Sequence, residues 1–184
     1  RDHCVTGVQT CALPIYIDIS PEKASFTQPC TNQPDGPGKR IGKRGEIHII
    51  GDVLPGGAKL FRERIARFQA EAGYWETRVG TVHDFRVLLF DNDTRLLISA
   101  VYDGDFIPYL NDVLEQAGQW FDFLMPGVWE GYVKATDAAT RELVARQAYS
   151  AEGFYAANPD LSIKDIAKMR RIASAVNDLL DAAN

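Results

Sequence analysis

The chain has little cysteine, and the cysteines that it has lie near its start. Cys4, Cys11 and Cys30 all precede the first segment with the composition of a folded domain. This placement excludes an internal disulfide framework and a cysteine-based zinc site from the rest of the chain. It also leaves no thiol nucleophile there. Such sparing use of cysteine is typical of a reducing compartment, and we expect a cytoplasmic protein.

Long apolar runs and an excess of basic residues are also missing. No run approaches the roughly 18 to 20 apolar residues that span a bilayer. The 20 Lys and Arg residues are outnumbered by 25 Asp and Glu residues, which gives a net charge of −5. An acidic chain of this kind does not fit a nucleic-acid partner. We therefore expect neither a membrane nor a nucleic acid as its partner.

Several common catalytic motifs are absent. The chain has no G-x-S-x-G elbow, no P-loop, no G-x-G-x-x-G after a strand and no H-E-x-x-H. The triplet Asp91-Asn92-Asp93 resembles a calcium-binding loop but lacks the glycine and the distal glutamate that such a loop needs. We interpret this triplet as a turn.

The opening segment, residues 1–15, reads RDHCVTGVQTCALPI and follows neither a helical nor a strand period. It also lacks the basic-then-apolar order of a signal peptide. The portion VTGVQTCALPI resembles one reading frame of a common sequencing-library adapter. We interpret residues 1–15 as adapter-derived and not native, the alternative being a genuine unstructured terminus. Sequencing the gene from intact source DNA distinguishes the two.

The next segment, residues 16–45, is rich in proline, glycine and small polar residues, and too poor in apolar residues to form its own core. We predict a disordered linker or arm. It carries a small basic cluster that either holds an anion or a partner or is simply solvated: Lys39, Arg40, Lys43 and Arg44.

Residues 46–184 are predicted to form a single domain. Hydrophobic periods and turn signals give strand 46–53, helix 58–72, two strands joined by a turn at 91–94, helix 106–123, strand 128–134 and helices at 136–157 and from 162 onward. Thr136 and a Ser162–Asp165 capping box are expected to begin the last two helices. The order predicts a ferredoxin-like βαββαβ α+β fold, an antiparallel sheet with helices on one face, and two C-terminal helices.

The hairpin register sorts side chains onto two faces. If Phe90 pairs with Arg95, then Arg86 lies opposite Ser99 and His83 opposite Tyr102. The helix-facing side is then Thr81, His83, Phe85, Val87, Leu89, Leu96, Ile98, Ala100 and Tyr102. The open side is Val82, Asp84, Arg86, Leu88, Phe90, Arg95, Leu97, Ser99, Val101 and Asp103. This open side has the mixed composition of a ligand cavity, with an apolar wall and a few polar anchors.

Six residues of the hairpin are the candidate site. His83, Arg86 and Asp103 are the catalytic candidates, and Asp84, Ser99 and Tyr102 are candidates for substrate binding. Arg86 suits a carboxylate or another anion, and imidazole titrates near neutral pH. The alternatives remain open: Arg86 pairs with Asp84 or Asp103 only to order the sheet, and His83 is a structural histidine bonded to the Tyr102 phenol. His48, inside an Ile-rich strand, is interpreted as structural.

The hairpin GTVHDFRVLLFDNDTRLLISAVYDGD and the downstream FYAANPDLSIKDI resemble the dimeric α+β barrel superfamily of ferredoxin-like proteins. They look most like a poorly characterised bacterial group with an H-x-x-R strand and a D-G after the next strand. His83, Arg86, Asp103 and Gly104 stand at those motif positions. The superfamily contains dye-decolourising peroxidases, chlorite-dismutase-like haem proteins, cofactor-free monooxygenases and small-ligand binders. The resemblance implies a homodimer with a cavity at its paired sheets.

Two functions follow from these observations. The first is a small oxidoreductase-like enzyme, of the peroxidase or monooxygenase class, acting on a small organic molecule on the open sheet face. Arg86 would anchor the substrate, Asp103 would accept a proton, and His83 would serve as acid or base, or as the iron ligand if haem is bound. No other metal ligand is predicted. The alternative is a non-catalytic ligand-binding or dimerisation module with a structural Asp/Arg cluster.

Overall fold

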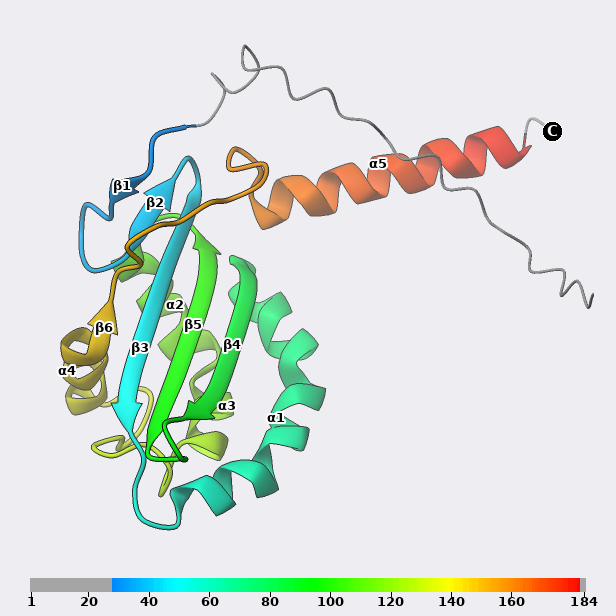
Figure 1. The fold of residues 1–184 in the computed structure, drawn as a ribbon. Helices are drawn as coiled ribbons and strands as arrows, with labels where there is room; N and C mark the ends of the chain where they lie inside the picture. Colours follow the sequence, from blue (N-terminus) through cyan, green and yellow to red (C-terminus); the bar gives the residue numbers. More distant parts are fainter. Residues whose placement is uncertain (1–27, 183–184) are drawn as a thin grey trace, which may run out of the picture.

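The computed structural model describes residues 28–182 (Figure 1). The adapter interpretation of residues 1–15, and the part of the predicted arm before residue 28, lie outside the described residues. Within residues 28–182 no helix combines the length and the apolar composition that crossing a bilayer requires.

The described part is an α+β structure with one open antiparallel sheet. Its strands are β1 (Thr31–Asn32), β2 (Lys39–Ile41), β3 (Arg44–Asp52), β4 (Val82–Phe90), β5 (Arg95–Asp103) and β6 (Ala148–Tyr149). Its helices are α1 (Gly57–Val79), α2 (Phe106–Gln116), α3 (Gly118–Leu124), α4 (Ala138–Gln147) and α5 (Ile163–Ala182). The strands follow the order β1-β2-β3-β5-β4, and β6 also pairs with β3. Without the β1–β2 hairpin, the order is β6-β3-β5-β4.

The β4–β5 hairpin has the predicted register over most of its length. Phe90 pairs with Arg95 and Arg86 pairs with Ser99. The three turn residues Asp91, Asn92 and Asp93 have φ of 53°, 53° and 69°. Asp and Asn tolerate this left-handed conformation better than other non-glycine residues, and this explains why the turn forms here.

The register breaks near the start of β4, where it had been predicted to continue. Val82 and not His83 pairs with Tyr102, and the next pair is Asp84 with Val101. His83 is therefore the extra residue of a β-bulge, which re-aims its side chain. Val82, assigned from the sequence to the open face, packs against the core instead.

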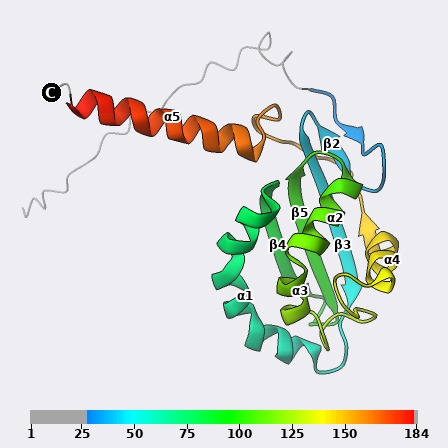
Figure 2. The same ribbon diagram turned by 180° about the vertical axis from the view of Figure 1, so that it is seen from behind.

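Helices cover one face of the sheet, as predicted. Figure 2 shows α1, α2 and α3 in front of the strands, and Figure 1 shows the opposite face with no helix over it. The helix-facing side chains of the sheet form the core, among them Ile47, Ile49, Leu96, Ile98, Ala100 and Tyr102. On the other face Leu88 is 39% exposed.

Two predicted helices have different bounds in the structure. The first extends about two turns beyond residue 72, to Val79. It is capped by Gly80, which has φ of 67° and donates its N–H to the Glu76 carbonyl. The predicted helix 106–123 is broken into α2 and α3 at Ala117–Gly118. A Cβ on Gly118 would lie 2.9 Å from Ala135 Cβ, so this close approach requires glycine.

The predicted fourth strand at residues 128–134 is wrong. Residues 128–131 form turns with one isolated bridge from Trp129 to Val53, and residues 132–134 have no regular structure. Gly131 has φ of 83°. Trp129 is buried, and its Nε1 donates to Gln147 Oε1 at 2.7 Å.

The strand that pairs with β3 on this side is β6, which lies inside the stretch predicted as helix 136–157. The N-cap of α4 is Asp137 rather than Thr136.

Residues 28–45 are folded, although composition predicted a disordered linker there. They contribute β1 and β2, and Gln33, Ile41 and Arg44 are buried. The Gln33 amide donates to the Tyr102 hydroxyl at 3.2 Å. A segment too polar to form its own core is ordered here because it pairs with β3 and packs on the domain's core.

Candidate functional site

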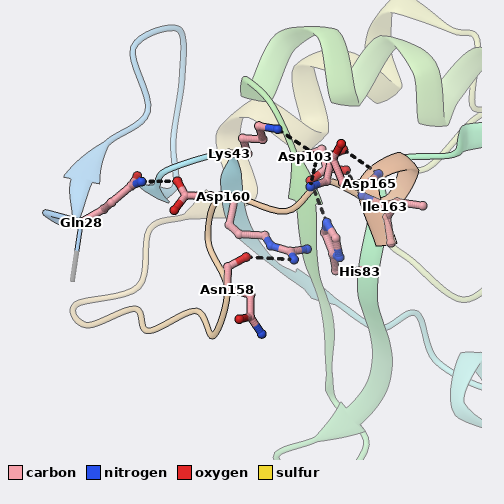
Figure 3. A network of polar contacts seen from close by, with 10 residues as sticks. Gln28, Lys43, His83, Asp103, Asn158, Asp160, Ile163 and Asp165 are labelled. Carbon is pink, nitrogen blue, oxygen red and sulfur yellow. Dashed lines mark hydrogen bonds and ion pairs between the residues drawn. The ribbon is translucent and has the colours of Figure 1, made fainter. Parts of the chain in front are cut away.

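The bulge at the start of β4 brings His83 to the end of β5. His83 Nε2 lies 2.7 Å from Asp103 Oδ1, and the two side chains are only 11% and 13% exposed (Figure 3). The sequence had placed these residues on opposite faces of the hairpin. Because a bulge changes the alternation of side chains by one residue, the pair forms across adjacent strands.

The second oxygen of Asp103 holds the beginning of α5. Asp103 Oδ2 accepts from the backbone N–H of Ile163, the first residue of that helix, at 2.7 Å. A carboxylate at a helix N-terminus satisfies an amide that has no partner within the helix. One carboxylate therefore ties together β4, β5 and α5, and we call His83, Asp103 and the Ile163 amide the clasp.

The predicted capping box at the start of α5 is confirmed. Ser162 N donates to Asp165 Oδ2 at 2.9 Å, and Asp165 N donates to Ser162 Oγ at 3.2 Å. Lys43 Nζ donates to the same carboxylate oxygen at 2.8 Å, as Figure 3 shows. The bond from Lys43, followed by those from the Ser162 hydroxyl and amide, holds the pKa of Asp165 well below its usual value.

This lowered pKa makes the start of α5 sensitive to acid. Because the folded-state pKa lies below the unfolded value of about 3.9, the stabilisation is present above that value and is lost as pH falls further. We expect the helical circular dichroism of α5 to decline below about pH 4. Asp165→Asn should flatten that dependence, whereas Asp178→Asn on the same helix should not. Equal acid profiles for all three proteins would contradict this.

A cavity of about 520 Å³ lies between α1 and the edge strand β4. Six aromatic residues line it, together with aliphatic ones: Phe68, Trp75, Phe85, Tyr109, Trp120 and Phe121. Phe68 and Trp120 are stacked with ring centroids 3.6 Å apart, and Trp120 Nε1 donates to the Phe68 carbonyl at 2.8 Å. The wall is therefore a fixed surface. Cavities of about 300–1,000 Å³ with mainly apolar walls are typical of small-molecule sites.

Polar groups line the same cavity along β4. His83, Asp84 and Arg86 contribute from the strand, and Gln69 and Glu76 from α1. His83 is thus both a lining residue and a member of the clasp. Since the Asp103 carboxylate accepts the proton on Nε2, the neutral ring carries its lone pair on Nδ1. Among residues 28–182, Nδ1 has no hydrogen-bond partner.

The remaining candidates from the sequence form a separate pair or are enclosed. Arg86 donates to Asp84 at 2.8 Å, with the side chains 62% and 40% exposed, and neither contacts Asp103. This is the structural alternative weighed from the sequence. His83, Arg86 and Asp103 therefore do not form one cluster in the structure, although His83 and Arg86 line one cavity.

Ser99 and Tyr102 do not line the cavity. Ser99 is buried between its neighbours on β3 and β4, and Tyr102 is fully buried on the helix side. Tyr102 stacks on Tyr109 with centroids 3.8 Å apart, and burial raises its pKa well above the usual value for a phenol. The expected bond between His83 and the Tyr102 phenol is wrong, because that hydroxyl accepts from Gln33 and the bulge turns His83 to Asp103.

The cavity also lies on a different side of the sheet from the one predicted. The composition of the open face predicted a ligand cavity there. The cavity in the structure is on the helix side, between α1 and the edge strand β4. The residues that sequence reasoning missed are Trp75 and Glu76 on the last turns of α1, and Trp120 on α3. The signal for Trp75 was the apolar period of the first helix, which continues past residue 72 to Trp75 and Val79.

His48 makes a second polar contact, with Glu46, on the open face of the sheet. Its Nε2 is 3.0 Å from Oε2 of Glu46, which is almost completely buried. The other oxygen of Glu46 accepts from the amides of Lys39 and Ala151 at 2.6 and 3.0 Å. Glu46 therefore ties β2 and the segment after β6 to β3. Within residues 28–182 no group of three or more His, Cys, Asp and Glu side chains is placed to hold a metal ion.

Comparison with known proteins adds no relative. No family model, no curated protein and no solved structure matches the chain.

Proposed function

We propose that this protein is an enzyme that binds a small organic molecule with an aromatic or apolar body in the cavity between α1 and β4. The observation that carries the proposal is His83, which lines that cavity while Asp103 holds its ring at 2.7 Å. A cavity with a rigid apolar wall and one oriented titratable group is the usual arrangement of a site for proton transfer.

The chemistry assigned to this site is acid–base catalysis by His83. Asp103 accepts the Nε2 proton, which fixes the ring and leaves Nδ1 as the proton acceptor. The register places the Arg86 side chain on the open face, so Arg86 reaches an anionic substituent only around the edge of β4 and in exchange for its exposed pair with Asp84. In this proposal Asp103 positions His83. It does not take the substrate proton itself, which is the role that the sequence analysis gave it.

The resemblance to the dimeric α+β barrel superfamily supplies the reaction class. The strand order β6-β3-β5-β4, all antiparallel, supports the ferredoxin-like arrangement on which the resemblance depends. We accordingly propose oxidoreductase-like chemistry of the cofactor-free monooxygenase kind. The homodimer that the resemblance implies would close over the open sheet face.

Haem does not fit the residues present. The imidazole nitrogen farther from the backbone reaches a large macrocycle with least crowding, and in His83 this nitrogen is bonded to Asp103. Arg86, the cation available to a propionate at the rim, is paired with Asp84. We therefore derive no step through haem.

A variant that fills the cavity tests the proposal. Gly73 lines the cavity, and a Cβ there would meet no atom within 4 Å, so Gly73→Leu places new side-chain volume without a clash at Cβ. The matched control is Ala70→Leu, at an exposed position of α1 outside the lining. Aromatic carboxylates, phenols and haemin would be screened by thermal unfolding and then by calorimetry.

A ligand at one hundred times its Kd is expected to stabilise the wild type and Ala70→Leu by about 2.7 kcal/mol, which raises Tm by about 5–10 °C. Gly73→Leu should not respond, and haemin should give no Soret shift. His83→Gln should retain binding and lose turnover. The proposal fails if no compound stabilises the wild type, or if Gly73→Leu responds like Ala70→Leu.

The non-catalytic module remains the second candidate, because two observations favour it. The clasp anchors α5, and Arg86 pairs with Asp84 within its own strand. Both contacts would serve stability alone. This candidate predicts that no compound in the screen stabilises the protein and that His83→Gln lowers Tm without changing any binding.

A further inference from the structure

Helix α5 leaves the body of the protein with its apolar side uncovered. Figures 1 and 2 both show it projecting away from the sheet and the other helices. No residue of its 20 is buried, and all of those from 167 to 182 are exposed. Helices in proteins gain most of their stability by packing an apolar face. The apolar side of α5 therefore requires an occupant.

The uncovered side is a continuous stripe with coiled-coil spacing. Met169, Ile172, Val176 and Leu179 are between 45% and 70% exposed. Ile166, Met169, Ala173 and Val176 follow one another at intervals of three, four and three residues. This alternation is the seam by which two helices pack knobs into holes. We call these six residues the α5 stripe.

Apart from Asp165, which pairs with Lys43 at the start of the helix, the charges of α5 are divided between its two halves. Lys164, Lys168, Arg170 and Arg171 lie in the first half, and Asp178 and Asp181 in the second. None of these six makes an ion pair within residues 28–182. Two copies of such a helix repel in a parallel pair and attract in an antiparallel one, where each basic half meets the partner's acidic half.

One pair of charges lies where it would meet across such an interface. Arg170 and Asp181 are 11 residues apart, about three full turns, so they lie on the same flank of the α5 stripe. In an antiparallel pair related by a two-fold axis, equal flanks face each other. Arg170 of each copy then comes level with Asp181 of the other. Arg171 is turned about 100° further, onto the outer side.

We propose that α5 is a dimerisation helix that pairs antiparallel with α5 of a second copy of this chain. A single two-fold contact buries both stripes and forms both Arg170–Asp181 pairs. A second copy of α5 therefore supplies both the apolar surface and the complementary charges that α5 needs. The seam is short, and the dimer is consequently reversible. This inference is independent of the proposed function, whose cavity lies within one chain.

Sedimentation velocity of the full chain, over a dilution series with a reducing agent, tests the proposal. Arg170→Asp should raise the dimer dissociation constant about tenfold, since two exposed pairs are replaced by repulsion. Arg171→Asp, with the same change of charge on the next residue, should leave it unchanged. Arg170→Asp with Asp181→Arg should restore it to within about threefold of wild type.

Val176→Asp should abolish the dimer, and circular dichroism of each variant reports whether α5 stays helical. The charge variants keep the test decisive even if Val176→Asp unfolds the helix. The proposal is overturned if the wild type is monomeric throughout, if Arg170→Asp and Arg171→Asp behave alike, or if the double variant fails to recover. It is also overturned if Leu88→Asp, on the open sheet face, dissociates the dimer while the α5 variants do not.

Discussion

Trp120→Ala is expected to lower the free energy of unfolding by about 3–5 kcal/mol. Trp120 is buried, stacks on Phe68 and lies 5.6 Å and 5.7 Å from the ring centroids of Phe85 and Phe121. The substitution removes the indole from this cluster and leaves a void next to the existing cavity. It also leaves the Phe68 carbonyl without its side-chain donor. Urea unfolding followed by circular dichroism measures the loss.

Trp120→Phe is the control for this prediction, because it keeps the stacked ring and removes the hydrogen bond and some volume. Trp120→Phe should lower the free energy of unfolding by about 1–2 kcal/mol. Trp75→Ala provides a second comparison, at another residue that lines the cavity but whose side chain is only partly buried. If Trp120→Ala costs no more than Trp75→Ala, the aromatic cluster does not form the rigid wall that the proposed site requires.

Asp103→Ala is expected to lower the free energy of unfolding by about 2–4 kcal/mol, because the clasp contains two hydrogen bonds to one carboxylate. The substitution leaves the His83 imidazole enclosed without its partner and removes the acceptor of the Ile163 amide. Chemical unfolding measures the overall loss. Amide hydrogen exchange locates it, with faster exchange expected in the first turn of α5.

Asp103→Asn separates the two roles of this residue. The amide oxygen can still accept from Ile163, while the amide nitrogen donates to His83 Nε2 and moves the imidazole proton to Nδ1. We expect α5 to remain anchored and the proposed proton acceptor to be lost, so activity should fall while the free energy of unfolding changes little.

Arg86→Ala, which removes an exposed ion pair, should lower the free energy of unfolding by less than about 1 kcal/mol. Equal losses for Asp103→Ala and Arg86→Ala would contradict the clasp.

The elements predicted correctly depend on short stretches of sequence. The hairpin register follows from β-rich runs on both sides of Asp91, Asn92 and Asp93, which tolerate the left-handed backbone that the turn adopts. The capping box of Ser162 and Asp165 depends on residues three apart. Helix faces follow from apolar periods. In each case the interacting groups lie within a few residues of each other, so local chemistry suffices.

The elements predicted wrongly depend on distant partners. Residues 28–45 have no core of their own and are ordered by pairing with β3. Residues 128–134 have the composition of a strand, but Gly131 and the buried Trp129 give them a turn, and Ala148–Tyr149 pairs with β3 instead. Composition describes only the segment itself and contains no information about which other segment covers it.

The sequence by itself determined the α+β class, the antiparallel hairpin, the helix-covered face and the identity of His83 and Asp103 as candidates. Only the tertiary structure decided that these two residues meet, that Arg86 pairs elsewhere, and that the cavity lies beside α1. The physical reason that His83 and Asp103 meet is a single bulged residue. Strict alternation puts His83 and Asp103 on opposite faces, and the bulge joins them. The partner that uses the other oxygen of Asp103 is the start of α5, 60 residues further along the chain, which no local pattern could reveal.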